Sequence, residues 1–76
     1  MKIKTTEELG AAIRSRRKEL KVSQKDLAMA SGTGLRFIIE LEKGKPTCQS
    51  GKMLDVLQAL GIGLFVDTVD RNDAGG

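Results

Sequence analysis

The side chains of this sequence that could do chemistry are mostly cations, and the usual groups of a catalytic centre are few. The chain has 76 residues, with 13 Lys and Arg, 10 Asp and Glu, no histidine and one cysteine. Without histidine, a glycine-rich phosphate loop after a strand, or a carboxylate pair suited to a cleft, no general acid or base arrangement can be named. An enzyme is therefore disfavoured, and binding of an anion is the better hypothesis.

The lone cysteine and the N-terminus limit the class of protein further. One thiol cannot form an internal disulfide, and a Cys/His zinc site needs histidine, so we expect no metal and no cofactor. Cys48 is interpreted as a small core or loop residue. The first residues lack the apolar run of a secretory signal, and no stretch is long enough to cross a bilayer. These features predict a cytoplasmic protein with no membrane contact.

Charge is divided unevenly along the chain. Residues 1–62 carry twelve basic and seven acidic side chains, whereas residues 63–76 carry one basic and three acidic ones. The basic part is expected to attract a polyanion, and nucleic acid is the usual one, although surfaces with no such role also show a balance of this size. RNA binding by base stacking is disfavoured, because Phe37 and Phe65 are the only aromatic residues.

The middle of the chain predicts two short helices joined by a glycine-containing turn. Ser23 is a good N-cap for a helix over residues 24–31, and Gly32 can end it with a positive φ. The next helix is predicted over 35–43, with Ile38 and Leu41 buried and Gly44 closing it. Two such helices at a steep angle can place the second one in the major groove of DNA.

Two further helices are predicted around this pair. Thr5 and Glu8 fit a capping box for a first helix that runs to about Leu20, and Leu9 and Ile13 recur within it at helical spacing. Thr47 or Ser50 is predicted to cap a fourth helix that reaches Leu60 and stops at Gly61. Residues 1–61 are therefore expected to form one all-α bundle of four to five helices.

The segment after residue 61 differs in kind. Residues 62–70 are rich in β-branched and apolar side chains and predict one short strand, for which the chain supplies no second strand. An unpaired strand edge invites pairing with a second copy of the chain, and the small core also favours a partner. The alternative is an extended segment lying on the bundle. We expect the dimer contacts at Leu64, Phe65, Val66 and Val69, and a flexible tail over 71–76.

The sequence resembles the Cro/C1-type helix-turn-helix domain, also called the xenobiotic-response-element-like family, over residues 9–62. The residues that carry the resemblance are Ser23-Gln24, Leu27-Ala28, Gly32, Ile38, Glu42, Gly44, Leu57 and Leu60-Gly61. It implies a lambda-repressor-like DNA-binding bundle. The segments 35–38 and 42–47, followed by a short hydrophobic strand, are most similar to short HipB-type antitoxins. That similarity implies a homodimer that binds operator DNA, represses its own operon in the nucleoid and neutralises a HipA-like kinase toxin.

The resemblance implies that one face of the third helix reads DNA bases. The residues that match this face are Leu35, Arg36, Ile39 and Glu40. Arg36 is the best candidate for reading guanine through O6 and N7, and its alternative is a phosphate contact. Leu35 and Ile39 could touch thymine methyls, while Glu40 could accept a hydrogen bond from cytosine N4 or repel misplaced phosphates. Phe37 is large for its position and is interpreted as structural.

The resemblance also implies phosphate contacts and one structural ion pair. The predicted phosphate contacts are Gln24, Lys25, Thr33, Lys43 and Lys45. Gln24 could instead be an ordinary exposed glutamine. Arg17 and Glu42 match an internal ion pair that fixes the first helix to the end of the third. Two alternatives to the antitoxin remain open: a stand-alone regulator like the phage repressors, and an interaction module that only holds a protein partner.

Overall fold

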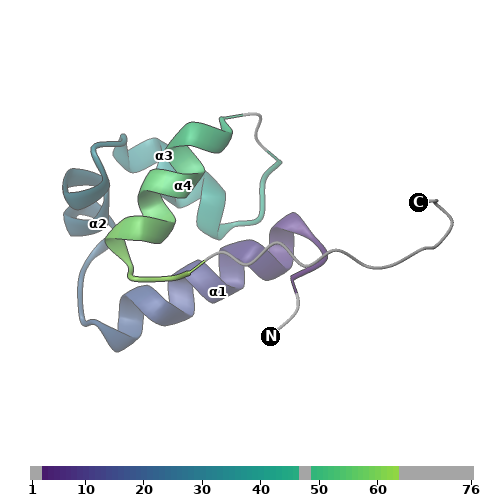
Figure 1. The fold of residues 1–76 in the computed structure, drawn as a ribbon, viewed down its shortest axis with the longest axis horizontal. Coiled ribbons are helices and arrows are strands. Elements are labelled where there is room, and N and C mark those ends of the chain that lie inside the picture. Colours follow the sequence, from purple (N-terminus) through teal and green to yellow (C-terminus); the bar gives the residue numbers. More distant parts are fainter. Residues whose placement is uncertain (1–2, 47–48, 64–76) are drawn as a thin grey trace, which may run out of the picture.

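The computed structural model of the chain describes residues 3–46 and 49–63, and in these ranges it contains four helices and no strand. They are α1 (Thr6–Glu19), α2 (Gln24–Ser31), α3 (Leu35–Glu42) and α4 (Ser50–Ala59), as labelled in Figure 1. The helical part of the predicted fold is thus confirmed. None of the helices in the described ranges combines the length and apolar character needed to span a bilayer.

The helix starts follow the predicted capping chemistry at α2 and in part at α1. Ser23 Oγ accepts from the Asp26 N–H at 2.9 Å, and the Asp26 carboxylate accepts from the Ser23 N–H at 3.4 Å, which completes a capping box. At α1, Thr5 Oγ1 accepts from the Glu8 N–H at 3.0 Å, but the Glu8 carboxylate accepts from the Lys4 N–H. The predicted capping box would have the Glu8 carboxylate accept from the Thr5 N–H. That part of the prediction was wrong, because the carboxylate bonds the preceding residue.

The start of α4 differs from the prediction. Gln49 occupies the N-cap position, and Ser50 is the first residue of the helix rather than its cap. Thr47, the other predicted cap, lies outside the described residues, as does Cys48.

All four described helices end in the same hydrogen-bonded turn, in which a left-handed residue sends the chain back over the last carbonyl groups. The residues with positive φ are Lys21, Gly32, Gly44 and Gly61. After α4, the Gly61 N–H donates to Gln58 O and the Ile62 N–H to Leu57 O. Ile62 also packs partly against the core, so this residue, predicted to start a strand, completes the end of α4.

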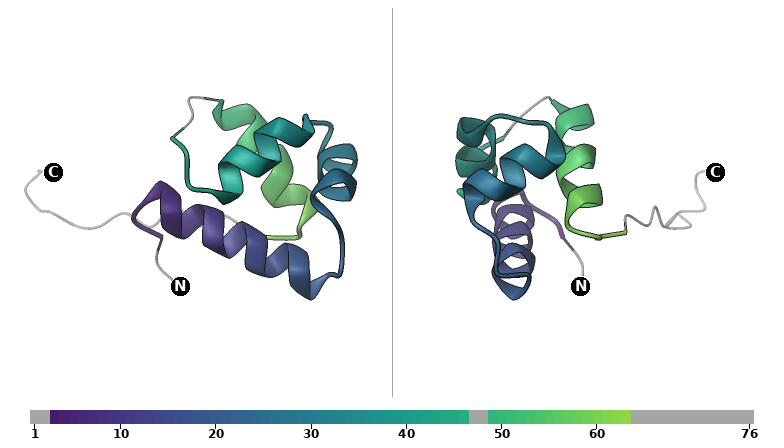
Figure 2. Two further views of the ribbon diagram at one scale, coloured as in Figure 1. Left: turned by 180° about the vertical axis from the view of Figure 1, so that it is seen from behind. Right: turned by 90° about the vertical axis from the view of Figure 1, so that its left-hand side faces the viewer.

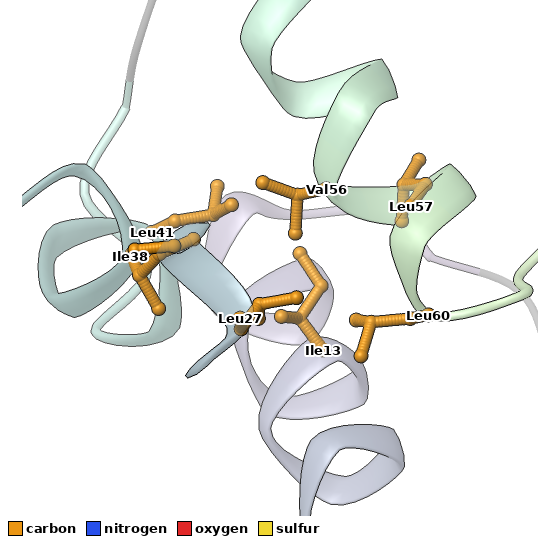
Figure 3. Close-up of a cluster of buried hydrophobic side chains, with 8 residues drawn as sticks. Ile13, Leu27, Ile38, Leu41, Val56, Leu57 and Leu60 are labelled. Atoms are coloured by element: carbon orange, nitrogen blue, oxygen red, sulfur yellow. The ribbon is translucent and has the colours of Figure 1, made fainter. Parts of the chain in front are cut away.

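One apolar core joins the four helices. It consists of Ile13, Leu27, Ala28, Ile38, Leu41, Val56, Leu57 and Leu60, most of which are labelled in Figure 3. Ile38 and Leu41 supply the buried edge of α3, as the sequence predicts. Leu20, where the first helix was predicted to end, follows the last residue of α1 and is exposed, and the left-handed turn at Lys21 comes directly after it.

The arrangement leaves α3 on an open side of the molecule. α1 runs along the base in Figure 1, below the other three helices. α2 packs against both α3 and α4, while α3 also packs on α1. In the right-hand view of Figure 2, α3 and α4 lie on opposite sides of the bundle, so the outer face of α3 is not covered by α4.

A glycine in α1 allows its close approach to the end of α3. A Cβ at Gly10 would overlap the Leu41 carbonyl oxygen and lie 2.7 Å from Glu42 O. Gly44, with a φ of 84°, likewise lies against the Glu7 backbone, where a Cβ would be 2.7 Å from Cα. The position of α3 on α1 therefore depends on two residues without side chains.

Candidate nucleic-acid interface

The four residues predicted to read bases share one surface. Leu35, Arg36, Ile39 and Glu40 line an open depression on the outer face of α3, together with Lys43. This follows from helical geometry. Leu35, Ile39 and Lys43 are spaced four residues apart and form one row along the helix, and Arg36 and Glu40 form the adjacent row. The opposite side of the helix carries the buried Ile38 and Leu41. The depression combines apolar walls with charged side chains.

A charged cluster of Arg36, Glu40 and Lys45 covers part of this face. The Glu40 carboxylate accepts from Arg36 Nε at 3.5 Å and from Lys45 Nζ at 3.3 Å. The side chains of Arg36 and Lys45 are 90% and 64% exposed, whereas that of Glu40 is 38% exposed. The hydrogen bond and charge of Lys45, and more weakly those of Arg36, hold the pKa of Glu40 below its ordinary value. Glu40 is therefore a carboxylate at neutral pH.

The turn after α3 places Lys45 in this cluster. Gly44 adopts a left-handed conformation, and the Lys45 N–H then donates to Glu40 O at 3.0 Å. The chain thus returns over the last turn of α3, and the Lys45 side chain reaches the carboxylate of the same glutamate. Lys43 is exposed at the end of α3, beside the depression.

A buried ion pair between Arg17 and Glu42 fixes the C-terminal end of α3 to α1. Arg17 Nε lies 2.6 Å from Glu42 Oε2, and Arg17 Nη2 lies 3.1 Å from Oε1. The side chains are only 11% and 4% exposed. The hydrogen bond from Arg17 to Glu42 raises the pKa of the guanidinium, against the opposing effect of burial. Arg17 Nη1 also donates to Val22 O at 2.9 Å, so this pair, expected from the resemblance, ties α1, the following loop and α3 together.

The predicted phosphate contacts at the start of the motif differ in exposure. Gln24 is half-buried, and its amide donates to Glu42 Oε1 at 3.1 Å, whereas the neighbouring Lys25 is exposed. Thr33 is half-buried in the turn between α2 and α3, where its hydroxyl shares a 2.9 Å hydrogen bond with Ser31. Lys25 and Lys43 are thus open to solvent anions and Lys45 is exposed but paired with Glu40, while Gln24 and Thr33 are held by protein contacts.

The α1 helix carries a cluster of four basic residues, Arg14, Arg16, Arg17 and Lys18, which does not form a single stripe. Arg17 is buried against Glu42, while Arg16 Nε donates to Leu60 O at 3.0 Å and its Nη1 pairs with Glu19. Arg16 therefore stabilises the carbonyl end of α4, and two of the cluster's cations serve the fold. Among the described residues, no three metal-ligating side chains come together.

The comparison with known families decides the identity of this fold. A family model described as helix-turn-helix matches residues 13–65, which is more than half of the chain. The chain belongs to the Cro/C1-type helix-turn-helix family. It is a DNA-binding transcriptional regulator of that family, and its structure places α2 and α3 as the two helices of the motif.

Relatives of this Cro/C1-type chain include one protein of similar length. The chain is 52% identical over 65 residues to a protein of Sinorhizobium fredii (strain NBRC 101917 / NGR234) described as an uncharacterized HTH-type transcriptional regulator, y4mF, and the match covers 86% of each chain. It is 35% identical to the clp gene regulator ClgR from C. glutamicum, with a TM-score of 0.69 over 82% of this chain and 80% of that one.

The fold is also similar to that of a chain in the HipA-HipB-O2-O3 complex. The TM-score is 0.81 at 20% identity, over 92% of this chain and 99% of the other. At this level of identity the likeness concerns the fold alone. It does confirm the HipB-like helical bundle that the sequence predicts.

Two contacts of this interface, Gln24–Glu42 and Glu40–Lys45, were not among those predicted from the sequence. The Gln24–Glu42 hydrogen bond joins residues 18 positions apart, and only the packing of α2 on α3 brings them together. The Glu40–Lys45 pair does have a signal, since a glycine one residue before a lysine at the end of a helix turns that lysine back over the helix.

Proposed function

We propose that this regulator is a dimeric, sequence-specific repressor that binds the operator of its own operon, and that it is the antitoxin of a HipA-like kinase toxin. The observation that carries the DNA-binding part is the outer face of α3, where Leu35, Arg36, Ile39, Glu40 and Lys43 line one open depression. An open helix face with a planar guanidinium and nearby lysines suits the edges of base pairs and the phosphates beside them.

Each predicted contact has a distinct part in this proposal. Arg36 reads a guanine, while Leu35 and Ile39 contact thymine methyls, and Glu40 belongs to the same face. Lys25, Lys43 and Lys45 bind phosphates from exposed positions. Gln24 and Thr33 hold hydrogen bonds within the protein, so their phosphate contacts require either a second donor group or a change of partner.

Dimerisation would bring two copies of α3 to two half-sites. The proposed contacts are Leu64, Phe65, Val66 and Val69, which lie outside the described residues, as does the 71–76 tail. In a symmetric dimer the two recognition helices would meet half-sites about one helical turn apart, roughly 34 Å. A two-fold symmetric operator is therefore expected.

The antitoxin part rests on the likeness to a chain of the HipA-HipB-O2-O3 complex, together with the similar chain lengths. It is tested by co-expressing the chain with a HipA-like kinase encoded beside it. We expect the two proteins to co-purify and the kinase to lose its toxicity. A regulator without such a partner would leave growth inhibition unchanged.

The DNA-binding part is tested by fluorescence anisotropy. The chain is titrated into duplex DNA from upstream of its own gene and into a scrambled duplex of equal length, at several salt concentrations. We expect preferential binding to the upstream duplex, with an affinity for both duplexes that falls as salt rises. No preference, or no binding at moderate salt, would favour a module that only holds a protein partner.

A further inference from the structure

We infer that Glu40 is a positioning and masking residue, which holds Arg36 for base reading and neutralises Lys45 until a matching DNA sequence is bound. The inference rests on the proposed DNA-binding function and assigns a role within the same face. It differs from direct base reading by Glu40, because the carboxylate acts here through its two cationic neighbours.

The geometry of Arg36 supports the positioning role. Its Nε lies 3.5 Å from Glu40 Oε2, one helical turn further along α3. A contact through Nε leaves the two terminal nitrogens of the guanidinium available, and these can donate together to guanine O6 and N7. Since the Arg36 side chain is 90% exposed, this ion pair is the one polar contact that restrains its direction among the described residues.

The geometry of Lys45 supports the masking role. Its ammonium lies 3.3 Å from the same carboxylate oxygen, and its backbone N–H is bonded to Glu40 O, so the lysine is held against the glutamate at both ends. A phosphate must compete with Glu40 for this ammonium. At the same time, the negative carboxylate stands on the face that approaches the DNA, where it repels phosphates that are out of place.

These two effects together favour discrimination. On a matching sequence, Arg36 gains its guanine contacts while Glu40 keeps a cationic neighbour. On a mismatched sequence, Arg36 gains nothing, and the carboxylate still opposes the approach of the backbone. Glu40 therefore lowers the affinity for wrong sequences more than the affinity for the operator.

The test is Glu40→Gln, measured by anisotropy on the upstream and scrambled duplexes. Glu19→Gln is the matched control, because it removes the same charge from a surface ion pair with Arg16 on α1. We expect Glu40→Gln to raise affinity for the scrambled duplex about fivefold. Affinity for the upstream duplex should change less than about twofold, because there the release of Lys45 is offset by the lost restraint on Arg36. Glu19→Gln should raise both affinities equally and slightly.

A double-mutant cycle distinguishes this role from a structural one. In a Lys45→Ala background, the gain on scrambled DNA from Glu40→Gln should shrink to less than about twofold, because part of it came from releasing that lysine. Loss of affinity for the upstream duplex alone would assign Glu40 to direct base contact and overturn the inference, and so would an equal loss on both duplexes. A wild-type chain that prefers neither duplex would instead refute the proposed function itself.

Discussion

At the scale of single residues, Arg36 is the side chain on which sequence preference should depend most. It is highly exposed on the outer face of α3, and its guanidinium can donate two parallel hydrogen bonds to one guanine. We predict that Arg36→Ala lowers affinity for the upstream duplex by about 1–3 kcal/mol and relaxes preference at one base position. Binding to a set of single-base operator variants measures this.

Arg36→Lys is the control for charge. It keeps the positive charge but loses the planar pair of donors, so it should lose most of the base preference while keeping affinity for scrambled DNA. If Arg36→Ala weakens binding by the same factor on every sequence, Arg36 contacts only phosphate.

The Arg17–Glu42 pair belongs to the same scale but serves the fold. The Glu42 side chain is 4% exposed and accepts from both Arg17 and Gln24. We predict that Glu42→Gln lowers the free energy of unfolding by roughly 3 kcal/mol, because the Arg17 guanidinium stays buried without a counter-charge. Urea unfolding followed by circular dichroism, at a fixed protein concentration, measures the loss.

Glu19→Gln provides the comparison here as well, since it breaks an exposed pair with Arg16 and should cost less than about 1 kcal/mol. Equal stabilities for the two variants would contradict the structural role of Glu42. The pair itself was expected only through the family resemblance, because nothing in the spacing of Arg17 and Glu42 brings them together. Their contact depends on how α1 crosses α3.

At the scale of helices, the sequence predicts where each helix ends better than it predicts how the helices pack on one another. Ser23 with Asp26, and the glycines at 32, 44 and 61, mark helix boundaries through local hydrogen bonds, so these boundaries could be predicted. Lys21 adopts a φ of 60° without being glycine, and its conformation is set by the turn around it. The need for Gly10 arises only where two helices meet, and a local pattern contains no information about that contact.

Gly10 and Gly51 provide a matched pair of substitutions. A Cβ at Gly10 would overlap backbone oxygens at the end of α3, whereas a Cβ at Gly51 in α4 has nothing within 4 Å. We predict that Gly10→Ala destabilises the chain by about 2–3 kcal/mol, because backbone cannot move aside as a side chain can. Gly51→Ala should instead stabilise it by roughly 0.5–1 kcal/mol through helix propensity.

Thermal unfolding of both variants tests this contrast. Gly10→Ala should also weaken DNA binding, because α3 must shift relative to α1. A Gly10→Ala variant as stable as the wild type would mean that the α1–α3 contact is looser than the structure shows.

At the scale of the whole molecule, the described bundle has its own core, and its last contributor is Ile62. This residue packs partly against the core, and its N–H completes the end of α4 by donating to Leu57 O. Removal of the segment after Gly63 therefore leaves every described core contact in place. Removal of residues 62–76 takes away Ile62 as well and should also reduce stability.

This difference allows dimerisation to be separated from folding. We predict that a chain ending at Gly63 keeps its helical circular dichroism but sediments as a monomer, because the proposed pairing residues Leu64, Phe65, Val66 and Val69 are gone. Its affinity for the two-half-site operator should fall strongly, since each bundle must then bind by itself, while its affinity for an isolated half-site should change little. A truncated chain that still sediments as a dimer would locate the interface on the bundle itself, within residues 3–63, and would refute the proposed C-terminal pairing.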